Sequence, residues 1–246
     1  MNMVFLKILC AAEEFYFKLN KKFFAVNYDL PDGFTVTYHA GAMHTEPNTV
    51  FSVKSAIEDN AQIVEFDVSF RPDGTPVIIH DSAPDDSQGE LLGNALKVVA
   101  EHPTCKINLD IKSMKNLGMV DELVRSYGLF ERVFYTGVFE DWVETVKKTS
   151  AIPYYLNYNI SANEVKDETQ LQSVADKVKD YGAIGINSNY RNANKRFVEV
   201  MHKNGLVVSL WTVNSISDMP KVLAYCPDNI TTKKPQLLKR LAFNQK

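Results

Sequence analysis

The sequence predicts a single (β/α)8 TIM barrel of the α/β class, with an extra helix at its N-terminus. Three observations support this fold. From residue 34 onward, apolar runs of strand length alternate with helical patterns, which indicates a parallel sheet with helices outside it. Eight such units occur, the number that closes a barrel. No G-x-G-x-x-G motif follows the first strand, which argues against an open dinucleotide-binding sheet.

The individual elements follow the chain in a regular order. Apolar runs of four to eight residues are typical of buried strands, and longer amphipathic stretches are typical of helices. We expect strands at 35–40, 62–69, 105–112, 133–137, 153–158, 183–188, 206–213 and 228–232. We expect helices at roughly 48–60, 87–101, 116–127, 139–149, 164–181, 193–204, 215–225 and 235–243. Gly128, Gly182 and Gly205 stand where helices should end.

The N-terminal region, residues 1–33, reads as an amphipathic helical extension of a barrel that spans residues 34–246. Its apolar residues recur at helical spacing: Phe5, Leu9, Ala12, Tyr16, Leu19 and Phe23. The uncharged run from Ile8 to Ala12 is too short for a signal peptide or a membrane span. We expect this helix to pack on the barrel; a membrane-surface role and a dimer contact are the alternatives.

Composition narrows the cellular setting and the partners. The net charge is −3, so the composition does not indicate the basic surface that a nucleic-acid partner would favour. Cys10, Cys105 and Cys226 are far apart and show no metal-binding spacing. An odd number of unpatterned cysteines is typical of a reducing compartment, and we expect a cytoplasmic protein with free thiols. The oligomeric state does not follow from these features.

Two carboxylates in an otherwise apolar strand, Glu65 and Asp67, are the strongest functional signal. They are two residues apart, so on a strand they face the same side. Buried like charges repel unless a cation lies between them. Asp110, near the end of the next predicted barrel strand, adds a third acid. Three carboxylates at the mouth of a barrel predict an Mg²⁺ or Ca²⁺ site; pairing with a basic residue from an outer helix is the alternative.

Two histidines and a lysine fall at the same predicted end of the barrel. His39 ends the first strand, His80 follows the second, and Lys112 ends the third. Two imidazoles can act as general acid and general base. A divalent cation and a lysine would stabilise charge that develops on a phosphoryl group. Composition by itself does not distinguish phosphorus chemistry from carbonyl chemistry.

These residues resemble the glycerophosphodiester phosphodiesterase family, which shares its barrel with several phospholipases. The family opens with H-R-G and E-N-T and continues with G-A-x-x-x-E-x-D-V and D-G-x-x-V-x-x-H-D. The chain carries "HAG" at 39–41, "EPNT" at 46–49, "NAQIVEFDVSFRPDGTPVIIHD" at 60–81, "NLDIK" at 108–112, "LWTVN" at 210–214 and "ITTKKP" at 230–235. The similarity covers nearly all of residues 34–246, and the stretch 63–81 is its most specific part.

The resemblance implies a role for each matching residue. Glu65, Asp67 and Asp110 would bind the cation, and His39 and His80 would be the acid/base pair. The residues expected at the substrate are Lys112 against a phosphate oxygen, Trp211 against the alcohol moiety, and Asn48. The turn after Arg71 would bring His80 back over the metal.

The activity implied is metal-dependent hydrolysis of a glycerophosphodiester to sn-glycerol 3-phosphate and an alcohol. The attacking oxygen belongs to water or to the glycerol 2-hydroxyl, and the sequence does not separate the two. Alternatives are a phospholipase D-like enzyme that acts on lysophospholipid or sphingomyelin, and a non-catalytic phosphodiester-binding barrel. An unrelated sugar isomerase of the same fold would need a different layout of acids and histidines.

Four departures from the family pattern affect the site. The arginine of H-R-G is Ala40, and the glutamate of E-N-T is displaced to Glu46 by Pro47. Asp110 stands where many members have glutamate. The segment between His80 and the third strand is short, so the mouth should be more open than in the family. We hypothesise that Arg191 or Lys233 replaces the phosphate contact missing at position 40.

Overall fold

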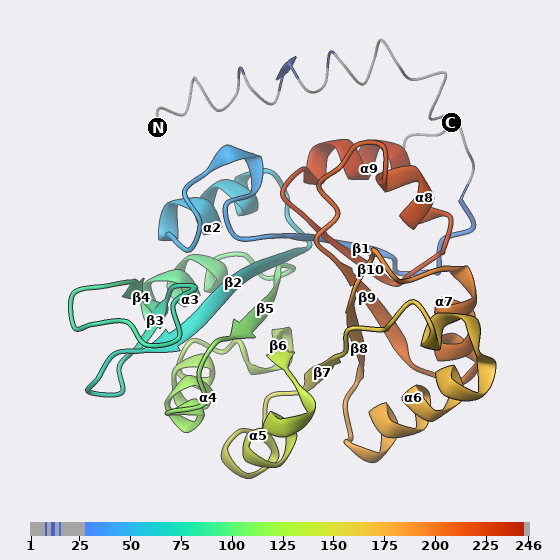
Figure 1. Cartoon of the computed structure of the whole chain (residues 1–246). Helices are drawn as coiled ribbons and strands as arrows, with labels where there is room; N and C mark the ends of the chain where they lie inside the picture. The colour runs from blue at the N-terminus through green and yellow to red at the C-terminus, as the bar shows by residue number, and fades with distance from the viewer. Residues whose placement is uncertain (1–7, 9–10, 13–14, 16–27, 244–246) are drawn as a thin grey trace.

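The computed structural model describes residues 8, 11–12, 15 and 28–243. Eight parallel strands form its centre, and the helices form a ring around them (Figure 1). The eight strands are β1 (Thr35–Tyr38), β2 (Ile63–Phe70), β5 (Lys106–Ile111), β6 (Val133–Val138), β7 (Tyr154–Asn157), β8 (Gly185–Asn189), β9 (Val207–Trp211) and β10 (Asn229–Thr232). Each lies within or overlaps a strand expected from the sequence.

The barrel is closed by β1, which pairs with both β10 and β2 in parallel register. Thr37 lies opposite Thr231 on one side and Ile63 on the other. The hydrogen-bonded order β1-β10-β9-β8-β7-β6-β5-β2 places consecutive barrel strands side by side. The predicted closed (β/α)8 fold is therefore confirmed.

Helices connect the strands and cover the outside of the barrel. They are α2 (Val50–Glu58), α3 (Leu92–Ala100), α4 (Leu117–Ser126), α5 (Val143–Thr149), α6 (Glu168–Asp180), α7 (Lys195–Lys203), α8 (Met219–Leu223) and α9 (Pro235–Phe243). The core lies between these helices and the strands. Outward strand residues such as Phe66 and Leu109 are fully buried there, together with helix residues such as Leu96 and Phe197.

The interior of the barrel is polar toward the C-terminal ends of its strands, whereas the layer between the strands and the helices is apolar. On β2 the apolar outward residues alternate with Glu65, Asp67 and Ser69. On β5 the same alternation gives Asn108 and Asp110. Because successive side chains of a strand point to opposite faces, this alternation places the polar residues inside the barrel.

An antiparallel ribbon follows β2, where the sequence predicted only a turn after Arg71 and, from residue 87, the start of a helix; the helix begins at Leu92 instead. β3 (Pro76–Ile78) pairs with the end of β2, and β4 (Glu90–Leu91) pairs with β3. Asp73 closes the turn by accepting hydrogen bonds from the backbone N–H and the hydroxyl of Thr75. Between β3 and β4 the chain forms only turns and bends.

Most of the predicted N-terminal extension lies outside the described residues. Ile8, Ala11, Ala12 and Phe15 are helical and exposed, and residues 28–33 form coil and a turn. No helix of the described part combines the length and the apolar character that a membrane crossing requires. Of the three cysteines, Cys105 and Cys226 are free thiols, and Cys10 lies outside the described residues.

We predict that Gly185→Ala destabilises the barrel. A Cβ atom at Gly185 would lie 2.4 Å from the carbonyl oxygen of Val207 and 2.9 Å from the Tyr155 ring, so β8 and β9 would have to separate. Overpacking of this kind costs about 1–3 kcal/mol of unfolding free energy, measurable by urea denaturation. Gly118→Ala is the control, because its Cβ would meet no atom closer than 3.8 Å. Equal stability of the two variants would contradict the prediction.

Candidate active site

The predicted acids converge at the C-terminal ends of β2 and β5. One carboxylate oxygen from each of Glu65, Asp67 and Asp110 lies within 4.8 Å of the other two. The strand register explains this, since Asp67 lies directly opposite Asp110 and Glu65 lies opposite Asn108. Glu65 and Asp67 are buried, and Asp110 is half-buried. The set of hard oxygen atoms fits Mg²⁺ or Ca²⁺.

Glu65 is the most strongly perturbed acid of the cluster. Burial raises its pKa well above the usual range, and the charges of Asp67 and Asp110 raise it further. Two influences oppose this upward shift of the pKa: the Ala40 N–H donates to Glu65 Oε2 at 2.8 Å, and the positive charge of Lys112 lies nearby. Without a cation, Glu65 therefore favours its protonated form.

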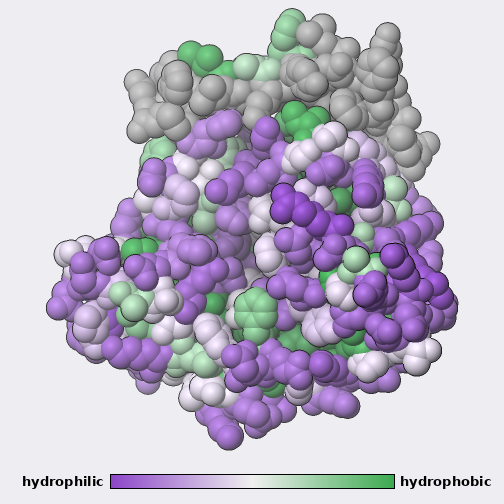
Figure 2. All heavy atoms as spheres, viewed as in Figure 1, coloured by the Kyte–Doolittle hydropathy of each residue, from purple (hydrophilic) through white to green (hydrophobic). Residues whose placement is uncertain are grey.

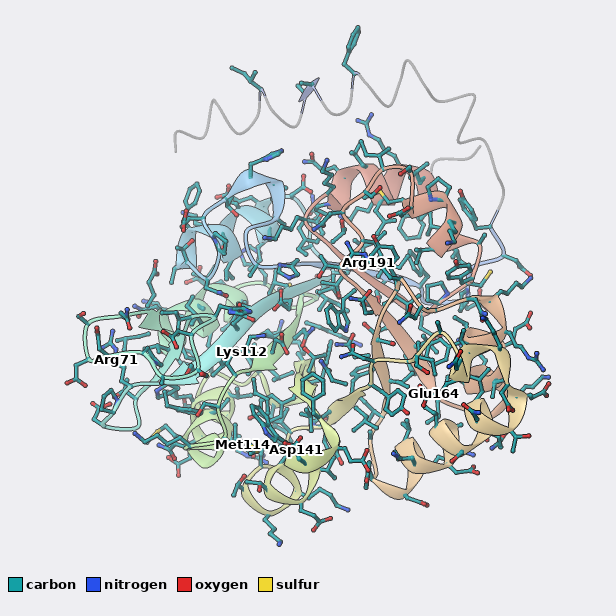
Figure 3. All side chains as sticks on the ribbon, viewed as in Figure 1. Arg71, Lys112, Met114, Asp141, Glu164 and Arg191 are labelled. Carbon is teal, nitrogen blue, oxygen red and sulfur yellow. The ribbon has the colours of Figure 1, made fainter. Side chains whose placement is uncertain are left out.

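Lys112 partly neutralises the cluster from the side of β5, where Figure 3 shows it close to the end of the strand. Its Nζ lies 2.6 Å from Asp110 Oδ2 and 3.0 Å from Asp67 Oδ1. Burial by itself would lower the pKa of Lys112, but these two carboxylates outweigh it and the pKa is raised. Lys112 therefore remains protonated at neutral pH.

Asn48 holds Asp67 through two hydrogen bonds. Its Nδ2 donates to Asp67 Oδ2 at 2.6 Å, and its Oδ1 accepts from the Asp67 N–H at 2.9 Å. The backbone of Asn48 has a φ of 56°, a left-handed conformation that asparagine tolerates better than most residues. Both ends of the Asn48 amide are therefore engaged by Asp67. The expected contact between Asn48 and the substrate stays a prediction.

His39 lies beside the acids at the end of β1. Its Nδ1 is 2.9 Å from the Ala40 carbonyl oxygen and 3.7 Å from Glu65 Oε2. A proton on Nδ1 would be donated to that carbonyl, which leaves the lone pair on Nε2. Burial lowers the pKa of His39; the hydrogen bond to Ala40 raises it, and the charge of Lys233 lowers it. The net shift is downward, which favours the neutral imidazole.

His80 reaches the same mouth on the antiparallel ribbon. The N–H of the preceding Ile79 donates to the Asp67 carbonyl oxygen at 3.1 Å, which extends the pairing of β2 and β3 up to His80. Arg71 secures the ribbon by donating to the carbonyl oxygens of Gln88 and Gly89. The predicted return of His80 over the acids is therefore present.

A cavity of about 680 Å³ opens at this end of the barrel and contains both histidines, the three acids and Lys112. Trp211, predicted at the alcohol moiety, also lines it. The remaining lining residues include Asp81, Ser82, Asn108, Thr136, Phe139, Trp142, Asn157, Asn187 and Thr231. Figure 2 views this face and shows mainly hydrophilic residues.

Asn108, Phe139 and Trp142 are among the lining residues that carry no functional expectation from the sequence. The sequence could have predicted Asn108 as a cavity residue, because it precedes Asp110 by two residues on one strand and therefore faces the same side. Phe139 and Trp142 follow β6 in a loop and a short 3-10 helix (Glu140–Trp142). Apolar side chains there carry no periodic signal that would separate a cavity wall from the core.

The positions that depart from the family pattern are accounted for only in part. Ala40 is buried and contributes its backbone N–H to Glu65, and Glu46 is exposed. The guanidinium of Arg191 lies 5.8 Å from the Tyr190 ring, on the other side of the mouth from Lys112 (Figure 3). Lys233 follows β10 directly, close enough to His39 to shift its pKa. Of Arg191 and Lys233, the two residues proposed to replace the missing arginine, Lys233 is the one whose charge acts on a residue of the site.

Comparison with known proteins agrees with this geometry. The family model of the glycerophosphoryl diester phosphodiesterase family matches residues 39–91 and 87–237. A glycerophosphodiester phosphodiesterase from Bacillus subtilis is 21% identical over 261 residues, which cover 86% of this chain and 87% of the relative.

Solved structures show the same fold. A glycerophosphodiester phosphodiesterase from Parabacteroides distasonis matches with a TM-score of 0.67 at 18% identity, over 88% of this chain and 98% of its own. A phosphodiesterase from Oleispira antarctica, solved in complex with the product sn-glycerol-3-phosphate, matches with a TM-score of 0.68 at 17% identity, over 86% and 96%.

The fold and the site define a barrel enzyme of the phosphoric diester hydrolase class. The chain belongs to the glycerophosphoryl diester phosphodiesterase family, because the family model matches most of its length. The resemblance seen in the motifs is thus confirmed.

We predict that the metal-free protein loses stability as pH rises, and that Glu65 causes part of this loss. The pKa of Glu65 is raised above its ordinary 4.5, so between the two values the folded state binds more protons than the unfolded state. The free energy of unfolding therefore falls as pH rises through this window. Thermal melts from pH 4.5 upward in chelator should show a shallower fall in Glu65→Gln than in the wild type.

Glu46→Gln is the matched control, since it removes an exposed acid close to the same mouth. It should retain the wild-type dependence on pH. A Glu65→Gln curve parallel to that of the wild type would show that Glu65 has an ordinary pKa.

Proposed function

We propose that this protein hydrolyses glycerophosphodiesters to sn-glycerol 3-phosphate and an alcohol, in a reaction that depends on one divalent cation, Mg²⁺ or Ca²⁺. The observation that carries the proposal is the placement of two histidines and three clustered carboxylates around one cavity. Family membership supports the phosphodiester as substrate. The product bound in the Oleispira antarctica structure supports the glycerol 3-phosphate portion.

The donor set fits a hard cation. Two of the three acids have one oxygen held by neutral groups of the scaffold: Glu65 by the Ala40 N–H and Asp67 by Asn48. The raised pKa of Glu65 indicates a cluster whose charge needs compensation. A bound cation supplies Lewis-acid stabilisation of the phosphoryl oxygens.

The two histidines have environments suited to opposite roles. His39 has a lowered pKa and an Nε2 lone pair, so it takes the proton from the attacking oxygen. His80 is exposed, lines the same cavity and protonates the departing alkoxide. Lys112 keeps its positive charge and binds a phosphoryl oxygen. Trp211 packs against the alcohol portion.

The direct test is release of glycerol 3-phosphate from glycerophosphocholine. Chelator-stripped protein should be inactive, and Mg²⁺ or Ca²⁺ should restore activity. His80→Ala should lower kcat by a factor on the order of 10²–10⁴, because the leaving group loses its acid. His102→Ala is the control, since this exposed histidine does not line the cavity.

The outcomes separate the alternatives. Full activity in chelator would contradict the metal dependence, and an unaffected His80→Ala would contradict the two-histidine mechanism. Metal binding without product from glycerophosphocholine or glycerophosphoethanolamine would overturn the proposed substrate. Lysophospholipid and sphingomyelin would then be the next substrates to assay.

We also propose that Lys233 supplies the phosphate contact that an arginine at position 40 would make. On β10 the inward residue Thr231 lines the cavity, and Lys233 directly follows the end of the strand, where its positive charge acts on His39. The Lys233 N–H donates to Asn214 Oδ1 at 2.8 Å, which fixes the backbone there. Within the described residues, no carboxylate forms an ion pair with the Lys233 ammonium.

Lys233→Met should weaken binding of sn-glycerol 3-phosphate about three- to tenfold, the value of one charge-assisted contact at a partly exposed site. It should also raise the pKa of His39, because a neighbouring positive charge is removed. Product inhibition and the pH profile of kcat/KM measure the two effects. Arg191→Met is the comparison variant; a larger loss there than in Lys233→Met would assign the contact to Arg191.

A further inference from the structure

Lys112 lies between two of the three acids that the proposed cation would use. Its N–H donates to the Val68 carbonyl oxygen at 2.9 Å, so Lys112 continues the pairing of β5 with β2 past Ile111. Two residues separate Lys112 from Asp110 on this extended chain, so both side chains point to the same inner face of the barrel. The ammonium therefore reaches the acids from the strand that carries Asp110 (Figure 3).

The Lys112 ammonium contacts one oxygen of each of two acids. Its Nζ lies 2.6 Å from Asp110 Oδ2 and 3.0 Å from Asp67 Oδ1. The second oxygen of Asp67, Oδ2, accepts from the Asn48 amide at 2.6 Å, so both oxygens of Asp67 are engaged. Among the described residues, Glu65 is the acid of the cluster that forms no ion pair with Lys112. A cation bound to all three acids therefore shares Asp67 and Asp110 with Lys112 or displaces the ammonium.

Solvent screens these charges only weakly. The side chain of Asp67 is 6% exposed, and the side chains of Lys112 and Asp110 are 20% and 22% exposed. The effective dielectric at such places is several times lower than in water, so neighbouring charges interact several times more strongly. An ammonium that contacts two ligands of a divalent cation repels that cation and reduces the negative potential of the ligands. Lys112 therefore opposes the binding of the cation that the same acids attract.

We infer that Lys112 competes with the divalent cation for Asp67 and Asp110, and that the phosphoryl group of the substrate relieves this competition by drawing the ammonium to itself. The inference rests on the proposed function and adds a coupling between cation and substrate. An ammonium has three donors, and two of them face the acids. The third donor is available to a phosphoryl oxygen while the pairs to the acids are still formed.

The competition makes the cation and the anionic substrate bind cooperatively. A phosphoryl oxygen that attracts the Lys112 ammonium leaves Asp67 and Asp110 with more of their negative charge for the cation. Coupling of this kind is reciprocal, so each partner raises the affinity for the other by the same factor. The free protein should therefore bind its cation weakly, and the complex with substrate or product should bind it tightly.

Calorimetric titration of chelator-treated protein with Mg²⁺ and, separately, with Ca²⁺ tests the competition without turnover. Lys112→Met should bind the cation about tenfold or more tightly than the wild type, because one positive charge beside the ligands is removed. Lys112→Arg keeps the charge and should bind the cation no more tightly than the wild type. Lys106→Met is the matched control, since this exposed lysine begins β5 at the opposite end of the strand, and its affinity should equal that of the wild type.

The same titrations in sn-glycerol 3-phosphate measure the coupling. In the wild type, this ligand should tighten cation binding by roughly tenfold or more. In Lys112→Met the factor should be smaller, because no ammonium has to leave the acids. Thermal melts give a second readout: the cation should raise the melting temperature of Lys112→Met more than that of the wild type. Lys112→Gln keeps hydrogen-bond donors without the charge, and replaces Lys112→Met if that variant does not fold in chelator.

Cation affinity that is unchanged or weaker in Lys112→Met would overturn the inference, as would an equal effect of sn-glycerol 3-phosphate on both proteins. Tighter cation binding by Lys112→Met, together with no turnover of glycerophosphocholine by the wild type, would overturn the proposed function and leave the competition in place. Turnover by the wild type with unchanged cation affinity in Lys112→Met would overturn the inference alone. Failure of the wild type and the variants to bind either cation would overturn both.

Discussion

The mutual repulsion of three carboxylates is the constraint on which the rest of this site depends. Glu65, Asp67 and Asp110 stand close together in a largely buried place, where like charges raise each other's pKa. Among the described residues that line the cavity, Lys112 is the one lysine or arginine, and it forms ion pairs with two of these acids. Three acids against one ammonium leave an excess of negative charge that suits a divalent cation.

The scaffold maintains this arrangement through backbone groups and neutral amides rather than through further charges. The Ala40 N–H holds Glu65, and the amide of Asn48 holds Asp67 at both its side chain and its backbone. Neutral donors orient a carboxylate without cancelling its charge, so the acids stay available to a cation. Asn157 and Asn187 in the wall of the same cavity are likewise joined by a hydrogen bond between neutral groups.

Much of the fold and of the site could be predicted from sequence because both follow short periodicities. All eight barrel strands and the helices between them match the alternation of apolar runs. Glu65 and Asp67 share an inward face because two residues separate them on a strand, and the site lies where parallel strands end. The ribbon was missed, since β3 was predicted only as part of a loop and β4 as the start of the helix at 87–101, because strands of two or three residues carry too little periodic signal.

The sequence by itself determined the class of barrel, the family and the identity of the residues at its mouth, because these depend on local pattern and motif spacing. Only the tertiary structure decided which groups meet. The pairing of Asn48 with Asp67, the bond between Asn157 and Asn187, and the approach of Lys233 to His39 join residues 19, 30 and 194 positions apart. Such contacts depend on strand register and barrel closure, which no local pattern encodes.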